Sequence, residues 1–157
     1  MTDAVSRAVT VEHDTFVLER GYPVPPARVF AAWADPAQKV QWFTGSQDVT
    51  STAYELDFQV GGREFNRADV GTSVFTYDAR IEDIVQDQRI VYSYFMTMDG
   101  RRFSVSLTTV EFRPDGNGTA LVLTEHGAYL DGLDQPELRR HGIGEQLAAL
   151  GTLLGSG

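Results

Sequence analysis

Large aromatic side chains recur at every second position in the middle of the chain. Because successive side chains of a β-strand point to opposite faces of a sheet, this spacing gathers them on one face. Buried tyrosine rings can grip an apolar molecule, while their hydroxyls need hydrogen-bond partners and can orient it. The residues that alternation places on this face are Phe75, Tyr77, Ala79 and Ile81, then Ile90, Tyr92, Tyr94, Met96 and Met98, then Phe103, Val105 and Leu107, and finally Leu121, Leu123 and Glu125.

Glu125 is the ionisable residue in this set with the clearest potential for catalysis. It alternates with Leu121 and Leu123, so it is expected to point to the same side of the sheet as the tyrosines. Burial there would raise its pKa and make it a candidate general acid or base. The alternative is that the strand has ended by residue 125 and that the carboxylate is solvated or paired with an arginine. His126 falls on the opposite face and is expected to be exposed.

The elements that must position these residues are short strands flanked by helices. Pro25 and Pro26 favour the start of a short helix, and a second follows over 37–42. Ile143 and Leu147 belong to an apolar stripe that predicts a long helix from Pro136 to Leu154, with Asp134 as its N-cap. Strands are predicted over 9–18, 49–60, 63–70, 74–85, 89–98, 102–112 and 119–129, with Asp99-Gly100 as a hairpin turn. The pattern indicates a meandering antiparallel sheet.

Length and charge restrict the classes of protein. A chain of 157 residues fits one domain, predicted over 10–157 after a weakly ordered N-terminus at 1–9. The formal net charge of −9 opposes binding to nucleic acid or an anionic membrane. The N-terminus lacks the apolar core of a signal peptide, and no apolar stretch reaches the roughly 20 residues of a membrane-spanning helix. We therefore expect a cytoplasmic protein with no nucleic-acid partner and no membrane insertion.

Metal and thiol chemistry find no support in the sequence. The chain has no cysteine, which excludes disulfides, thiolate catalysis and cysteine-based metal sites. Its three histidines, His13, His126 and His141, form no HxxxH or HExxH pair. We expect no metal and no cofactor, and no established catalytic motif is present.

Four motifs, taken together and in order, resemble a known family. They are PPARVFAAW at 25–33, VQWF at 40–43, DFQVGGREF at 57–65 and RIVYSY at 89–94. The chain resembles the START-like helix-grip (SRPBCC) superfamily over about 12–154, in the branch related to the activator of the ninety-kilodalton heat-shock-protein ATPase. The resemblance implies an α+β, START/Bet v-like helix-grip fold, in which a curved antiparallel sheet with two short helices wraps around a long C-terminal helix.

The resemblance also implies a function and a site. A cavity between sheet and helix would bind a small hydrophobic molecule. Two alternatives are an enzyme of the polyketide cyclase or dehydratase type acting on such a ligand, and a co-chaperone-like protein-interaction module that contacts a chaperone. Where relatives usually carry a tryptophan, this chain has Ile143, which leaves space beneath the helix. The candidate ligand-binding residues are Trp42, Phe43, Phe75, Tyr77, Tyr92, Tyr94, Met96, Phe103, Glu125, Ile143 and Leu147.

Overall fold

The computed structural model describes residues 9–45 and 49–155. Within these residues the chain forms one seven-stranded sheet and three helices. The elements in chain order are β1 (Val11–Tyr22), α2 (Pro26–Ala34), α3 (Pro36–Phe43), β2 (Thr50–Leu56), β3 (Arg63–Val70), β4 (Ser73–Val85), β5 (Arg89–Met98), β6 (Arg101–Asp115), β7 (Gly118–Leu130) and α4 (Pro136–Gly155). Residues 1–8 of the expected weakly ordered N-terminus lie outside the described residues.

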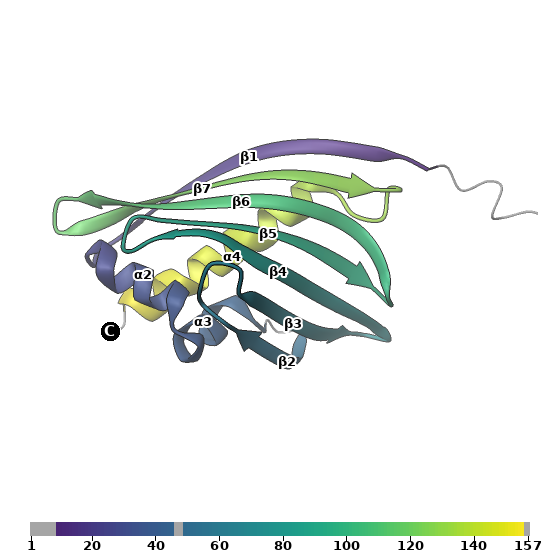
Figure 1. Cartoon of the computed structure of the whole chain (residues 1–157), viewed down its shortest axis with the longest axis horizontal. Helices are drawn as coiled ribbons and strands as arrows, with labels where there is room; N and C mark the ends of the chain where they lie inside the picture. Colours follow the sequence, from purple (N-terminus) through teal and green to yellow (C-terminus); the bar gives the residue numbers. More distant parts are fainter. Residues whose placement is uncertain (1–8, 46–48, 156–157) are drawn as a thin grey trace, which may run out of the picture.

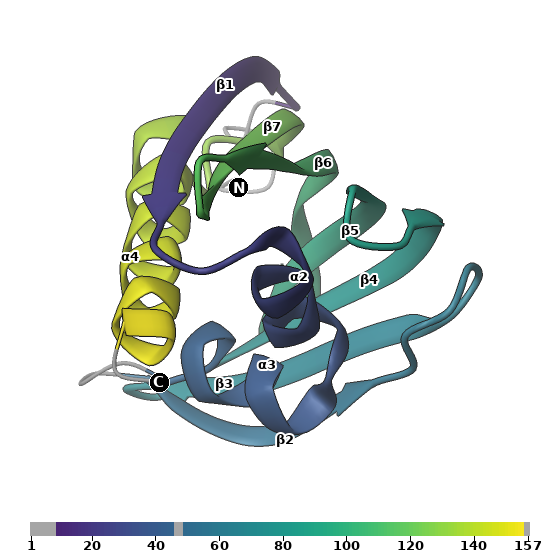
Figure 2. The same cartoon turned by 90° about the vertical axis from the view of Figure 1, so that its left-hand side faces the viewer.

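The sheet is antiparallel throughout and curves around α4. Its strand order is β1-β7-β6-β5-β4-β3-β2, so β2 to β7 form a meander and β1 pairs with the last strand. Figure 1 shows the long helix crossing the sheet, and Figure 2 shows the strands curving around α4, with α2 and α3 at one end. This arrangement confirms the α+β helix-grip fold predicted from the sequence.

The two short helices begin and end where proline and aspartate dictate. Pro26 occupies the first turn of α2, where a missing N–H costs nothing. Asp35 then ends α2 and caps α3, because its Oδ1 accepts a hydrogen bond from the Ala37 N–H at 3.1 Å. This places Trp33 of α2 and Trp42 of α3 in the core, with 4.8 Å between their ring centroids.

The strand predicted over 49–60 is shorter in the structure, because β2 ends at Leu56. The next residues make a tight connection that needs both glycines of the third motif. Gly61 adopts a φ of 85°, and a Cβ at Gly62 would lie 2.0 Å from the Asp57 carbonyl oxygen.

Along β6 the structure contradicts the predicted inner face. Val105 and Leu107 point outward and are 43% and 44% exposed. The reason is a register shift opposite Met96 and Thr97, where Phe103 is an extra residue and the alternation reverses after it. Phe103 is still buried, but the inward residues that follow are Ser104, Ser106, Thr108, Val110 and Phe112.

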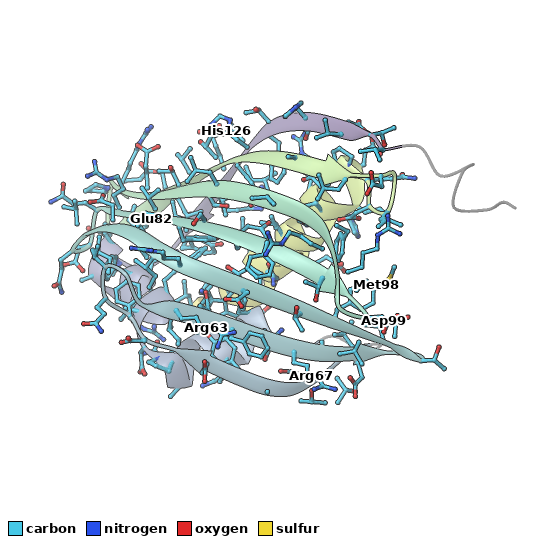
Figure 3. The ribbon with its side chains drawn as sticks, turned by 45° about the vertical axis from the view of Figure 1, so that its right-hand side comes forward. Arg63, Arg67, Glu82, Met98, Asp99 and His126 are labelled. Atoms are coloured by element: carbon cyan, nitrogen blue, oxygen red, sulfur yellow. The ribbon has the colours of Figure 1, made fainter. Side chains whose placement is uncertain are left out.

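The outer face of the sheet carries charged and polar side chains, among them Arg63, Glu82 and His126 (Figure 3). Arg63 Nη2 pairs with Asp78 Oδ2 at 2.8 Å, and Ser93 donates to Glu82 at 2.7 Å. His126 is exposed, as predicted from its place in the alternation. None of the helices in the described part of the chain is long and apolar enough to cross a membrane.

Helix α4 packs its apolar stripe against the sheet. Leu147, Leu150 and Leu154 are fully buried, and the Tyr22 hydroxyl donates a hydrogen bond to the Leu147 carbonyl at 2.9 Å. The residue before the helix is Gln135, whose carbonyl accepts the first helical hydrogen bonds, so Asp134 is not the N-cap. The Asp134 carboxylate accepts a hydrogen bond from Arg139 instead.

Candidate ligand-binding site

A cavity of about 320 Å³ lies between the inner face of the sheet and α4. All eleven residues singled out from the sequence line it, and they come from α3, β4, β5, β6, β7 and α4. The lining residues are Trp33, Trp42, Phe43, Phe75, Tyr77, Tyr92, Tyr94, Met96, Phe103, Leu123, Glu125, Asp134, Leu138, Arg139, Gly142, Ile143, Gln146 and Leu147.

Aromatic rings in mutual contact make most of the wall. The ring centroids of Tyr77 and Tyr94 are 4.8 Å apart, and those of Phe43 and Tyr77 are 5.1 Å apart. Trp42 is only 3% exposed and belongs to the deep part of the wall, whereas the sequence led us to expect Trp42 or Phe43 near the mouth. Leu138 of α4 is 62% exposed and marks the rim. The cavity therefore opens beside the first half of α4.

Glu125 lies within this site and has no exposed surface. The strand β7 continues to Leu130, so Glu125 stays in the alternation and faces inward. Its Oε1 accepts a hydrogen bond from Thr108 at 2.7 Å, and its Oε2 accepts one from Tyr94 at 2.8 Å. Burial raises the pKa of Glu125, against the opposing effect of these two donors and of Arg139. The alternative interpretation is wrong about an ended strand and a solvated carboxylate, although the carboxylate does lie 3.9 Å from an arginine nitrogen.

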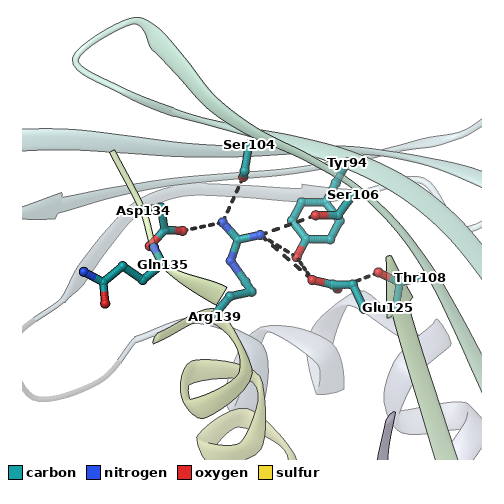
Figure 4. A network of polar contacts seen from close by, with 8 residues as sticks. All are labelled: Tyr94, Ser104, Ser106, Thr108, Glu125, Asp134, Gln135 and Arg139. Atoms are coloured by element: carbon teal, nitrogen blue, oxygen red, sulfur yellow. Dashed lines mark hydrogen bonds and ion pairs between the residues drawn. The ribbon is translucent and has the colours of Figure 1, made fainter. Parts of the chain in front are cut away.

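Arg139 lies at the centre of a network of polar contacts, which Figure 4 shows, and this network forms the polar end of the cavity. Its Nη1 donates to the Tyr94 hydroxyl at 3.0 Å, and its Nη2 donates to Ser104 at 2.8 Å. Nη2 also donates to Asp134 Oδ2 at 2.8 Å. Hydroxyls of β5 and β6 and a carboxylate of the segment before α4 thus hold the guanidinium in place.

The tyrosines of the wall remain neutral. Burial is the main cause that raises the pKa values of Tyr77, Tyr92 and Tyr94 well above the usual value. Tyr94 accepts from Arg139 and donates to Glu125, so its hydroxyl connects the two charged groups. The hydroxyl of Tyr77 is buried without a hydrogen-bond partner, as is the indole N–H of Trp33.

The sequence analysis missed Arg139 and the polar residues of β6 that hold it. One signal was available, because Arg139 lies four residues before Ile143 and eight before Leu147, on the same helical stripe. An arginine in an apolar stripe must find buried partners, and Ser104 and Ser106 alternate with the residues that face outward. Asp134 was predicted only as the N-cap of the long helix, and not as a partner of Arg139.

A second buried cation, Lys39 of α3, stands behind the aromatic wall. Its Nζ donates to both carboxylate oxygens of Glu64, at 3.1 and 2.9 Å, and Tyr54 also donates to that carboxylate. The ammonium lies 4.3 Å from the ring centroid of Phe43 and 4.9 Å from that of Trp33. Burial lowers the pKa of Lys39, and Glu64 opposes this shift. Across the described ranges, no three His, Asp or Glu side chains are grouped so that they would hold a metal ion.

The curved sheet, the long helix and the cavity between them define a helix-grip protein of the SRPBCC superfamily. The chain belongs to the family described as "Activator of Hsp90 ATPase homolog 1-like protein", whose model matches residues 23–155. A search of curated proteins found no match.

Solved structures from bacteria share the whole fold. A Rhizobium leguminosarum protein is 40% identical, with a TM-score of 0.91 over 96% of this chain and 99% of its own. A Rhizobium loti protein is 43% identical, with a TM-score of 0.84 over 91% of this chain and 98% of its own. An AHSA1-like protein of Aeromonas hydrophila, 19% identical, shares the fold with a TM-score of 0.68 over 91% of this chain and 93% of its own.

Proposed function

We propose that the protein binds a small hydrophobic molecule in the cavity between the sheet and α4. The observation that carries this proposal is the cavity of about 320 Å³, whose wall is mainly aromatic and whose polar groups are gathered at one end. Small-molecule sites are typically apolar cavities of about 300–1,000 Å³ with a few polar groups that fix orientation. A solid core of the same residues would leave no such volume.

The test is to fill the cavity from α4. Ile143→Trp adds roughly 60–80 Å³ of side chain, which would stabilise the empty protein by about 1.5–2 kcal/mol if it fills unoccupied space. Gly142→Leu is a second filling variant, because a Cβ at Gly142 would meet no atom within 4 Å. Gly144→Ala is the matched control, since its Cβ would meet Arg20 instead and Gly144 does not line the cavity.

Binding is measured with the uncharged fluorescent probe N-phenyl-1-naphthylamine, and melting curves are recorded with and without it. We expect probe binding in the wild type and in Gly144→Ala, and none in the two filling variants. Native mass spectrometry of the protein from its own host identifies any co-purifying small molecule. Equal probe binding in the wild type and both filling variants, or no probe binding in the wild type, would contradict the proposal.

A second candidate function is proton transfer on the bound molecule. The hydrogen bond of 2.8 Å from Tyr94 to Glu125 favours it, because a buried carboxylate with a raised pKa is suited to act as a general base. In such a step the Tyr94 oxygen takes a proton from the carbon next to a ligand carbonyl and the Tyr94 hydroxyl passes its own proton to Glu125, which leaves an enolate, and the protons then return the same way. The assay is exchange of the α-protons of 2-tetralone in D₂O, followed by NMR, which Glu125→Gln should abolish.

The protein-interaction alternative has less support from the described surface. It requires an exposed apolar patch of several hundred Å². Val17 of β1 and Leu107 of β6 are exposed, but β7 runs between them and places the exposed His126 beside Leu107.

A further inference from the structure

The polar end of the cavity has its positive charge already neutralised. Arg139 is the only basic side chain among the described residues that line the cavity, and two carboxylates accompany it. Asp134 Oδ2 lies 2.8 Å from its Nη2, and Glu125 Oε2 lies 3.9 Å from its Nη1. The three groups carry a net negative charge when Glu125 is ionised and no net charge when it is protonated. In neither state does this end of the cavity offer a surplus positive charge.

Most of the charged and hydroxyl donors around Arg139 already serve protein acceptors. Both terminal nitrogens of Arg139 donate to protein oxygens, and the Tyr94 hydroxyl donates to Glu125. Carboxylate oxygens each have two acceptor positions, and each Asp134 oxygen accepts one protein hydrogen bond, from Gln135 or from Arg139. Asp134 is 18% exposed, whereas Glu125 is fully buried. A ligand can therefore donate a hydrogen bond to Asp134, whereas Glu125 affects the ligand only through its charge.

An anionic ligand would face repulsion that this end does not compensate. Its carboxylate would lie close to two like charges, or would have to displace Asp134 from Arg139 inside a site of low dielectric constant. The other buried cation near the wall, Lys39, is matched by Glu64 and gives no relief. The net charge of −9 on the whole chain adds a field of the same sign.

We infer that the cavity selects uncharged ligands that donate a hydrogen bond to Asp134, and that Asp134 and Glu125 exclude carboxylates of the same shape. The inference rests on the proposed function, because it specifies the ligand class of the same cavity. Aromatic or aliphatic alcohols and phenols have the required chemistry, and fatty or aromatic acids do not. Asp134 acts by contact and charge, whereas Glu125 acts by charge alone.

The test compares three probes built on one ring system, 2-naphthol, 2-methoxynaphthalene and 2-naphthoate, by isothermal titration at pH 7. For the wild type we expect 2-naphthol to bind at least tenfold more tightly than 2-naphthoate and several-fold more tightly than 2-methoxynaphthalene. Asp134→Asn should reduce both preferences. Glu125→Gln should reduce only the difference in affinity between 2-naphthol and 2-naphthoate, because it removes a charge that the ligand does not touch.

Glu137→Gln is the matched control, because it removes the same charge from an exposed residue of α4 that does not line the cavity. It should leave both preferences as they are in the wild type. Equal affinity of the wild type for 2-naphthol and 2-naphthoate overturns this inference and leaves the cavity proposal standing. If none of the three probes nor N-phenyl-1-naphthylamine binds the wild type, the proposed function itself fails.

Discussion

In the described part of the chain, Lys39 and Arg139 are cations buried to a similar degree, but their surroundings differ. Lys39 donates to both oxygens of one carboxylate, Glu64, and aromatic rings pack around its ammonium. Arg139 instead distributes its hydrogen bonds over hydroxyls and Asp134, and it lines the cavity. The first is a closed pair that joins α3 to β3. The second is an open cluster that faces the cavity.

Buried charge is therefore held in two different ways in one core. A pair enclosed by packing can fix the position of an element, and either charge is costly when it stays buried without its partner. A distributed cluster keeps most of its hydrogen bonds when one of its partner residues is changed. Mutational costs should therefore differ between the two regions.

The largest effect is expected at the closed pair. Glu64→Gln leaves the Lys39 ammonium buried without a counter-charge, so we expect a loss of about 3–5 kcal/mol in the free energy of unfolding. Urea unfolding followed by circular dichroism measures it. The double variant Lys39→Met/Glu64→Gln should recover most of the loss, because the unpaired charge is gone. A loss below about 1 kcal/mol for Glu64→Gln would show that the pair is not closed.

A smaller effect is expected in the open cluster. Glu125→Gln should cost about 1 kcal/mol at neutral pH, because Arg139 keeps Asp134 and its hydroxyl partners, and the glutamine oxygen still accepts from Thr108. The removal of a buried negative charge offsets part of the lost hydrogen bonding. The same urea titration provides the value. A cost as large as that of Glu64→Gln would remove the distinction between the two regions.

Much of the open site was predictable from the sequence, because it depends on local periodicity. The alternation of Tyr92 and Tyr94 in β5 and the four-residue spacing of Ile143 and Leu147 in α4 fix which side each residue faces. Glu125 follows from the same rule. The order of strands follows from turn residues such as Asp99-Gly100, which adopt φ values of 51° and 83° in the β5–β6 hairpin.

The rest of the fold and of the site depends on contacts between residues that are far apart in the sequence, which local patterns do not predict. The extra residue Phe103 in β6 reverses the alternation, and the apolar outward residues Val105 and Leu107 concealed that reversal. The closed pair joins Lys39 to Glu64 across 25 positions, so neither residue indicates burial by itself. Arg139 is the exception, since its place in the apolar stripe of α4 indicates by itself that the guanidinium needs buried partners.

The smallest expected effect is a pH dependence confined to the open cluster. Burial raises the pKa of Glu125 in the folded protein above its value in the unfolded chain, about 4.3. The folded state therefore binds this proton more strongly, and the stabilisation it gives is complete below about pH 4 and is lost as the pH rises through the folded-state pKa. Glu125→Gln has no such group, so the stability of the wild type relative to this variant should fall from pH 4 to pH 7. Urea midpoints of the two proteins, measured at intervals of one pH unit, give the difference in stability between them. The other carboxylates are the same in both proteins, so their contributions cancel. Lys39 does not contribute, because it is present in both proteins. A difference that stays constant over this range would mean that Glu125 ionises equally in both states, and that the open cluster does not penalise its own negative charge.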